Sequence, residues 1–289
     1  MDISSLNAFI AVAREGSFSK ASKRLFITQP AVSKRVAALE AELGVELFNR
    51  VARSISLTEA GKQLLPKARE LVNQADELQI YASNLTDDIS GNLSVAIAHH
   101  IGLYRMQPIL REFHQRYPLV HLNIRFEDSE QASSSVEQGD IEFGVITLPS
   151  TLPEKIKSEV IWLDDLNVVV AGDHSLAQYR NVTISDLANH ACVLPTKETE
   201  THQIMERVFA KHKLQLTSQM ETNSLETLKM LVGAGLGWSL LPSTMLDSDK
   251  LIVLDIGEAL TRDLGLVFHA KRSLSNAAAA LSDLIRGSV

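Results

Sequence analysis

Residues 17–40 read SFSKASKRLFITQPAVSKRVAALE, and this stretch decides the fold of the first part of the chain. It predicts two short amphipathic helices joined by a tight turn. In the first helix Phe18, Ala21 and Leu25 share one apolar face. The second helix opens with Pro30 in its first turn, where a missing N–H costs nothing. Its apolar residues recur every three or four positions and are expected to face the core: Val32, Val36, Leu39 and Leu43.

The opposite face of the second helix has the chemistry of a surface that reads a DNA major groove. Gln29 can form a bidentate pair with adenine, Lys34 can donate to guanine, and Ser33 can bond to base edges or phosphate. Between Arg14 and Arg35 there are six basic residues and one acidic residue, which suits a phosphate-facing surface. An ordinary helical hairpin with solvated lysines has the same pattern, so these residues alone leave both interpretations open.

Composition divides the chain into a basic head and an acidic body. The chain has 289 residues, enough for about two domains, and a net charge of −7. Residues 1–61 carry +2 and residues 62–289 carry −9, so only the head is suited to phosphate. The one cysteine, Cys192, excludes an internal disulfide, and its apolar surroundings favour an inert core residue over a redox sensor. Without a leader sequence or an apolar span of about 20 residues, we expect a cytoplasmic protein without membrane contact.

A short hairpin is predicted directly after the second helix. Gly44 ends that helix, and residues 45–48 and 54–57 can pair as strands. A hairpin in this position is a wing. Arg53 at its tip is a candidate for contact with the minor groove or the DNA backbone, the alternative being an exposed arginine without a partner.

A long helix capped by Thr58 is predicted to run to about Asp87. Its apolar residues alternate at spacings of four and three, which is a heptad pattern: Leu64, Ala68, Leu71, Ala75, Leu78, Ala82 and Leu85. Such a seam needs another helix to cover it, either within the chain or from a second copy. Since no other heptad helix is visible, we expect a dimer, which would set two reading helices on an inverted-repeat operator.

Two blocks of this region resemble the LysR-type transcriptional regulators: FITQPAVSKRVAALEAELGVELFNR at residues 26–50 and SLTEAG at residues 56–61. The resemblance extends over the whole chain. It implies DNA contacts at the positions Gln29, Pro30, Ser33, Lys34 and Arg53. Lys34 stands where the family commonly has arginine, so a point charge replaces a bidentate fork at guanine.

From Ser90 onward, strands and helices alternate, which is typical of parallel α/β architecture. Helices are expected at residues 103–117 and 133–138. Two chain crossings, near residues 161–165 and 261–266, predict two lobes, and the resemblance implies a bilobal, periplasmic-binding-protein-like effector domain. The fold class is therefore α+β multidomain. The expected domains are a winged helix-turn-helix at 1–58, a linker helix at 59–89 and an effector domain at 90–289, with lobe I at 90–161 and 266–289 and lobe II at 162–265.

An effector site is expected between the lobes, at the carboxyl ends of the strands. The residues expected to line it are His99, His100, Ile101, Thr147, Thr196, Asn223 and Ser224. Helix N-termini after His100 and Asn223 favour an anionic effector. The histidine pair would make the response depend on pH, unless both are satisfied loop residues.

The sequence shows no enzyme signature, so we expect no catalytic residues, cofactor or metal. No G-x-S-x-G motif is present. The glycines at 233–237 follow a predicted helix and precede a predicted strand, which is the reverse of the order around a dinucleotide-binding loop. The histidines fit no metal-ligand spacing. We expect a DNA-binding regulator controlled by a small molecule, forming a tetramer, with RNA polymerase a candidate further partner. The contrary class is a bilobal small-molecule-binding protein whose N-terminal helices serve assembly, or an enzyme.

Overall fold

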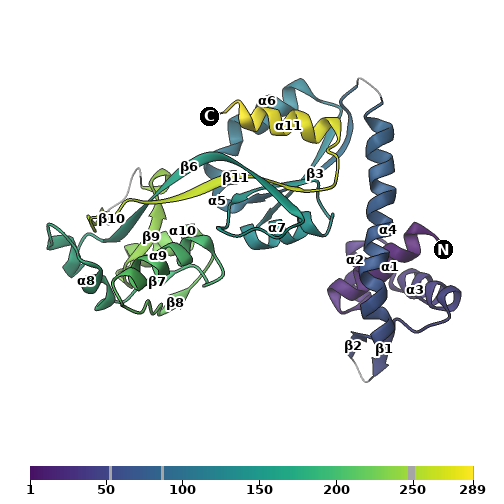
Figure 1. Ribbon diagram of the computed structural model, residues 1–289, viewed down its shortest axis with the longest axis horizontal. Coiled ribbons are helices and arrows are strands. Elements are labelled where there is room, and N and C mark those ends of the chain that lie inside the picture. The colour runs from purple at the N-terminus through teal and green to yellow at the C-terminus, as the bar shows by residue number, and fades with distance from the viewer. Residues whose placement is uncertain (52–53, 86–87, 247–250, 289) are drawn as a thin grey trace. The chain divides into compact units, whose positions relative to one another are not determined.

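The computed structural model describes residues 1–51, 54–85, 88–246 and 251–288. The chain forms two compact units, residues 1–86 and residues 87–289, and each is described by itself (Figure 1). In the described part of the chain, every helix is too short or too polar to cross a membrane.

Unit 1 is a helical cluster with a two-stranded hairpin and a long final helix. Its elements are α1 (Ile3–Glu15), α2 (Phe18–Arg24), α3 (Gln29–Leu43), β1 (Phe48–Val51), β2 (Ser54–Leu57) and α4 (Glu59–Ser83). Helix α3 ends at Gly44, whose φ of 70° lies in the left-handed region that glycine adopts without strain. Val32, Val36 and Leu39 are buried as expected, whereas the prediction for Leu43 is wrong because that side chain is 38% exposed at the helix end.

The hairpin has the expected second strand, whereas its first strand lies three residues later than predicted. Phe48 pairs with Leu57 and Val51 with Ser54, in antiparallel register. The first strand begins at Phe48 rather than at Val45, because the Glu40 side chain accepts a hydrogen bond from the Leu47 N–H at 2.8 Å and holds that segment against α3.

Unit 2 begins with an α/β lobe around three parallel strands. Its elements are β3 (Gly91–Ala98), α5 (His99–Tyr104), α6 (Met106–Arg116), β4 (Val120–Glu127), α7 (Ser129–Glu137), β5 (Phe143–Thr147) and the final helix α11 (Asn276–Arg286). Strand β3 lies between β4 and β5 and is parallel to both. The parallel architecture predicted for this part of the chain is confirmed.

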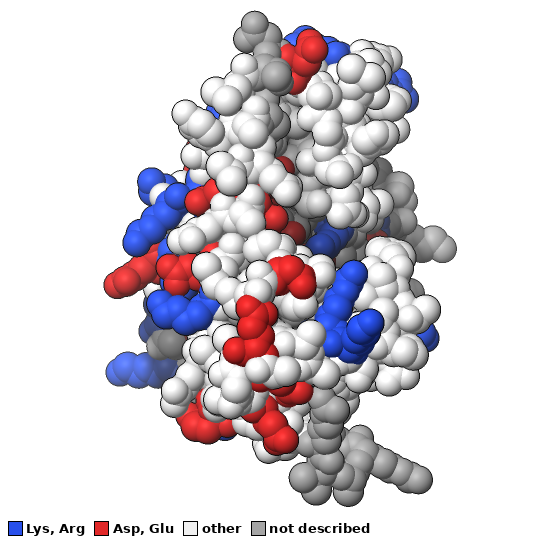
Figure 2. Space-filling view, turned by 90° about the vertical axis from the view of Figure 1, so that its right-hand side faces the viewer, with Lys and Arg blue, Asp and Glu red and all other residues white. Residues whose placement is uncertain are grey.

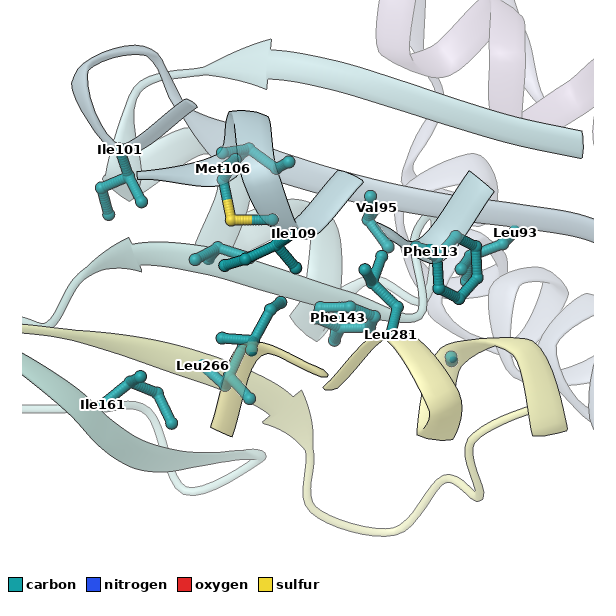
Figure 3. Close-up of a cluster of buried hydrophobic side chains, with 14 of the residues drawn as sticks. Leu93, Val95, Ile101, Met106, Ile109, Phe113, Phe143, Ile161, Leu266 and Leu281 are labelled. Atoms are coloured by element: carbon teal, nitrogen blue, oxygen red, sulfur yellow. The ribbon is translucent and has the colours of Figure 1, made fainter. Parts of the chain in front are cut away.

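Alternate residues of these strands pack in two separate hydrophobic cores. Val95 and Phe143 lie in the core under α6 and α11, where Phe113 and Leu281 are also buried (Figure 3). The neighbouring strand residue Ala96 faces the other side of the sheet, in the core under α7. Figure 1 shows α6 and α11 on one side of the sheet and α7 on the other. Both faces are therefore covered, which leaves the strand ends as the exposed edge.

Two long antiparallel strands connect this lobe to a second one: β6 (Ile156–Ala171) and β11 (Leu260–His269). The remaining elements are η1 (Ser175–Gln178), α8 (Ile184–Ala188), β7 (Val193–Leu194), α9 (Glu200–Lys211), β8 (Met220–Glu221), α10 (Leu225–Gly233), β9 (Ser239–Pro242), η2 (Ser243–Met245) and β10 (Leu251–Val253). Seven strands share one sheet in the order β10-β6-β11-β5-β3-β4, with β9 also paired to β6.

The crossing strands are antiparallel to β5, β9 and β10, so the sheet is mixed where the sequence predicted parallel strands. Trp162 and Leu264, which the predicted ranges give to lobe II, pack in the first core. Leu166 and Leu260 begin the second core, in which Trp238 is fully buried. The change from one core to the other therefore occurs within the crossing strands themselves.

The helix predicted at residues 103–117 is interrupted. Arg105 separates α5 from α6 with a φ of −127°, outside the helical region. Its guanidinium lies 3.1 Å from Asp164 and 5.4 Å from the Trp162 ring, contacts that a side chain on a continuous helix need not make. The break thus directs a cation at the crossing strands.

The crossing is tightest at Gly265, and replacing this residue tests whether the crossing strands limit the stability of unit 2. The strand register shifts between Leu264 and Gly265, and a Cβ at position 265 would overlap the carbonyl oxygen of Glu159. We expect Gly265→Ala to lower the free energy of unfolding by about 1–3 kcal/mol, measured by denaturant unfolding. Gly233→Ala is the control, because a Cβ there meets nothing within 4 Å and a helical alanine adds up to about 1 kcal/mol. Equal behaviour of the two variants would contradict a strained crossing.

Candidate functional site

The polar face of α3 is presented on a fixed support in unit 1. Gln29, Pro30 and Lys34 are exposed and Ser33 is half-buried. The opposite face packs on α1 and α2 in the unit's core. Four of the five predicted DNA-contacting residues therefore share an accessible face. Arg53 lies outside the described residues.

An exposed aromatic residue that the sequence analysis did not assign lies beside this face. Phe26 is 94% exposed in the turn before α3 and has a φ of 53°. A bulky residue in the left-handed region is uncommon and costs about 1–3 kcal/mol. An apolar ring at this position can contact a thymine methyl group. The signal was the break in the apolar period, which by itself did not distinguish a turn from a contact.

The basic residues between Arg14 and Arg35 are all exposed or half-buried. Arg24 also lies 3.6 Å from Glu15. Figure 2 shows one face of the molecule, on which acidic side chains form a band with Lys and Arg side chains on either side. Among the basic side chains between Arg14 and Arg35, Arg24 is thus partly compensated by an acidic neighbour.

The heptad seam on α4 is divided. Ala68 is buried and Leu64 half-buried in the core of unit 1, so for these two positions the prediction of an intermolecular seam is wrong and the intramolecular alternative holds. Leu71, Leu78 and Leu85 are 40%, 69% and 72% exposed. Ala75 is half-buried and Ala82 exposed. Helix α4 ends at Ser83 rather than near Asp87, so Leu85 lies beyond the helix, and the exposed seam positions up to Ala82 are available to another helix.

A cavity of about 50 Å³ lies between the two lobes of unit 2. Four of the residues predicted for the effector site line it: His99, His100, Thr147 and Asn223. Two hydrogen bonds link the lobes here, from Asn223 Nδ2 to Asp128 Oδ2 at 2.9 Å and from the Ser150 N–H to Glu200 Oε2 at 2.9 Å. Both lobes therefore contribute groups to one small site.

Three of the predicted effector residues do not line the cavity. Ile101 is fully buried in the first core. Thr196 donates through N–H and Oγ1 to the Asn223 side chain at 3.0 and 3.1 Å, so it orients a lining residue. Ser224 caps α10 by accepting from the Thr227 N–H. The assignment of these three as lining residues is wrong, since core packing and capping use their side chains.

Most charged residues of the lining were missed: Glu127, Asp128, Glu130, Glu200, Glu226 and Arg262. Three of them lie in the first turns of α7, α9 and α10. The sequence analysis began α7 at Ser133, four residues late, and so excluded its first turn. Thr199 caps α9 and Glu200 follows it, so an acidic residue after a capping threonine was the available signal.

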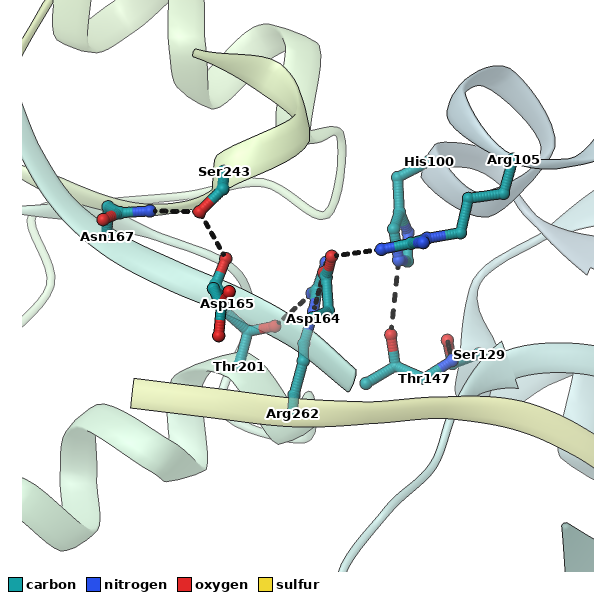
Figure 4. Close-up of polar contacts among 10 residues, drawn as sticks. All are labelled: His100, Arg105, Ser129, Thr147, Asp164, Asp165, Asn167, Thr201, Ser243 and Arg262. Atoms are coloured by element: carbon teal, nitrogen blue, oxygen red, sulfur yellow. Dashed lines mark hydrogen bonds and ion pairs between the residues drawn. The ribbon is translucent and has the colours of Figure 1, made fainter. Parts of the chain in front are cut away.

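A buried ion pair forms one wall of the site. Arg262 on β11 donates through Nε to Asp164 on β6 at 2.9 Å and through Nη1 to Thr201 on α9 at 2.7 Å (Figure 4). Arg105 reaches the other Asp164 oxygen at 3.1 Å. The side chains of Arg262 and Asp164 are each 3% exposed. Burial lowers the pKa of Arg262, while Asp164 opposes that effect.

His100 lies against this wall, 3.5 Å from Thr147 Oγ1 (Figure 4). Burial holds its pKa well below the ordinary value of 6.5, and the positive charges of Arg262 and Arg105 lower it further. The imidazole is therefore neutral near pH 7.

Cys192 on the second core behaves as predicted. It is buried, and burial raises the pKa of its thiol to about 12, so the reactive thiolate is disfavoured. In the described part of the chain, no group of three or more His, Cys, Asp or Glu residues could hold a metal ion.

Unit 1 has the architecture of a winged helix-turn-helix and unit 2 that of a bilobal small-molecule-binding domain. The model of bacterial regulatory helix-turn-helix proteins of the lysR family matches residues 3–62, and that of the LysR substrate binding domain matches residues 86–289. The chain belongs to the LysR family of transcriptional regulators. It is a regulator and not an enzyme, as the sequence predicted.

One full-length relative supports this assignment, and two solved structures share the fold. The HTH-type transcriptional activator CmpR from Synechocystis sp. is 30% identical over 284 residues, covering 96% of this chain and 92% of the relative. A full-length OxyR variant from Pseudomonas aeruginosa has a TM-score of 0.70 at 23% identity, covering 99% of this chain and 95% of that chain. CbnR in complex with its target DNA has a TM-score of 0.64 at 23% identity, with full coverage of both chains. The predicted fold class is confirmed.

The low pKa of His100 makes a prediction about acid stability. A histidine whose folded pKa lies below its unfolded value contributes stability that is complete above about pH 6.5 and is lost as the pH falls below it. We expect the chain to lose thermal stability between about pH 7 and about pH 5, and His100→Gln to lose less over the same range. His114→Gln, an exposed histidine on α6, is the control. A parallel decline in His100→Gln and the unaltered chain would contradict a neutral imidazole at position 100.

Proposed function

We propose that this regulator binds an inverted-repeat operator through α3 and responds to a small molecule held between the lobes of unit 2. The observation that carries the effector part is the cavity whose lining comes from both lobes. A ligand that contacts both lobes binds one lobe angle better than others and so shifts their equilibrium. The domain ranges given above, from the winged helix-turn-helix to the two lobes, are part of this proposal.

The reading residues of the proposal are Gln29, Pro30, Ser33 and Lys34, with Arg53 as the wing contact. The support comes from the accessible polar face of α3 on a packed core. We propose that α4 pairs two chains and that effector domains pair further to form a tetramer. Ligand binding would then change the spacing or bending between two DNA-bound dimers. RNA polymerase is proposed as a further partner, and the cytoplasm as the location, because the DNA lies there.

The anionic effector expected from the sequence fits the lining of the cavity poorly. The N-terminus of α10, which was expected to attract an anion, already carries Glu226 in its first turn and the Ser224 cap. Helix α5 has only six residues, so its N-terminal field is weak.

Substitutions on α3 test the reading face. We expect Ser33→Ala with Lys34→Ala to abolish the preference for operator over unrelated DNA, because each base contact contributes about 1–3 kcal/mol of discrimination. The ratio of the two dissociation constants at one salt concentration is the measurement. Lys67→Ala is the control, since it removes an exposed lysine from α4. Retained operator preference together with a smaller salt dependence would mean that Lys34 contacts phosphate only.

The dimer is tested on the exposed part of the seam. We expect Leu78→Lys to give monomers, because a desolvated charge in a helix–helix seam is unfavourable and Leu78 lies outside the core of unit 1. The mass is measured by light scattering. Gln74→Lys adds the same charge to the same helix without removing an apolar side chain. An unchanged mass for Leu78→Lys would remove α4 from the dimer interface.

A further inference from the structure

The cavity between the lobes is lined by carboxylates rather than by cations. Its charged lining consists of Glu127, Asp128, Glu130, Glu200, Glu226 and one guanidinium, Arg262. They come from the end of β4, from the start of β11 and from the starts of α7, α9 and α10. Acidic groups from both lobes thus converge on a cavity of about 50 Å³.

Within the described chain, only one of these carboxylates has a cationic partner. Glu200 accepts from Arg207 at 2.6 Å. Glu127 and Asp128 accept from neutral groups, the Ser135 hydroxyl at 3.2 Å and the Asn223 amide at 2.9 Å. Among the described residues, no Lys or Arg forms an ion pair with Glu127, Asp128, Glu130 or Glu226. These four side chains are the uncompensated carboxylates.

Glu226 also carries an orphaned acceptor. Its Oε1 atom is buried and has no hydrogen-bond partner among the described residues. A buried acceptor without a donor is unfavourable by about 1–3 kcal/mol, and by more when the group is charged. Glu130 responds to the same surroundings, since burial and then the charges of Asp128, Glu198 and Glu200 raise its pKa. The cationic side chain in the described lining, Arg262, lies with Nη2 2.8 Å from Asp164 Oδ2, and no ion pair joins it to Glu130 or Glu226.

Helix termini do not supply the missing charge. The N-termini of α7, α9 and α10 contribute roughly half an elementary charge each. Arg105 and Arg262 share Asp164, which leaves one surplus positive charge. Together these amount to about two and a half positive charges, against the four uncompensated carboxylates. The excess negative charge is lost only when a cation enters or a carboxyl group is protonated.

A metal ion is the less suitable occupant, because no group of three or more potential metal ligands is present in the described chain. Hydroxyl groups of Ser129, Thr199 and Thr201 are interspersed with the carboxylates. Such a mixture accepts the several N–H groups of an organic cation.

We propose that the effector carries an ammonium or guanidinium group, which the uncompensated carboxylates bind between the lobes. This inference rests on the proposed function and names the chemical class of its ligand. Binding the cation would hold α7 of lobe I and α10 of lobe II to one group, which favours the closed arrangement of the lobes.

Ligands with one four-carbon skeleton and different end charges test the charge of the effector on the full chain. The probes are 1,4-diaminobutane, 4-aminobutanoate and butanedioate at millimolar concentration, with magnesium chloride to represent inorganic cations. We expect a rise of a few degrees in Tm with the diamine, a smaller rise with the amino acid, and none with the dicarboxylate or magnesium. The inference is overturned if Tm rises with the dicarboxylate alone or with magnesium alone. It is also overturned if neither the diamine nor the amino acid raises Tm.

Two variants locate the binding. Glu226→Gln and Glu130→Gln should each weaken diamine binding at least tenfold by calorimetry, whereas the exposed Glu206→Gln on α9 should leave it unchanged. Diamine binding that all three variants retain would place the amine elsewhere and overturn the inference.

The unliganded variants give a readout that does not depend on the probe. If the carboxylates repel one another, Glu226→Gln and Glu130→Gln raise Tm in the absence of ligand. If these side chains only stabilise their own helix N-termini, both variants lower Tm, which contradicts the inference. Failure of the proposed function differs from failure of this inference. If only the proposed function fails, the amine binds in the cavity but does not change the affinity of the protein for DNA.

Discussion

The ion pair between Asp164 and Arg262 is the contact on which the arrangement of unit 2 depends. Burying two ions costs several kcal/mol each, and the cost is offset only when their geometry and remaining hydrogen bonds are good. Here the carboxylate receives Arg262 and Arg105 on different oxygens, and the guanidinium also reaches Thr201. The pair therefore joins both crossing strands to α9 in lobe II and to the α5–α6 break in lobe I. A hydrophobic pair of equal volume would fill the space without fixing these four segments in one register.

Besides this ion pair, two kinds of contact join the lobes: the crossing strands and single hydrogen bonds. The crossing strands are continuous in the sheet, so their bonds persist whatever the lobe angle. The bonds from Asn223 to Asp128 and from Ser150 to Glu200 are single links across the cavity, which a small rotation would break. His100 lies between the two kinds of contact and remains neutral, so it adds no positive charge beside Arg262. The movable groups are thus mainly acidic and the fixed groups mainly cationic.

The features that the sequence predicted correctly are those whose signals lie within one helix or strand. Capping residues and heptads act within one helix, so Thr58 was placed correctly before α4. The same locality explains Gln29 and Lys34, whose exposure follows from the apolar period of α3. The acidic lining could not be predicted in this way, because it exists only when β4, α7, α9 and α10 are folded together. Asp164 and Arg262 are 98 residues apart, and nothing in either local sequence indicates that they meet. The sequence analysis recognised two helix N-termini, after His100 and Asn223, but it could not bring together the carboxylates in the first turns of α7, α9 and α10.

Helix α4 shows how one sequence pattern can serve two cores. The heptad is continuous over Leu64 to Leu85, yet its first positions pack under α1 and its later positions are exposed. A helix of 25 residues is about 37 Å long, and its buried first turns and exposed later turns belong to one continuous element that contains Pro66. Any partner that covers Leu78 and Leu85 is then oriented with respect to α3, because α3 and the start of α4 share a core. Periodicity alone could not separate these roles, since burial against α1 and burial against a second copy require the same apolar residues.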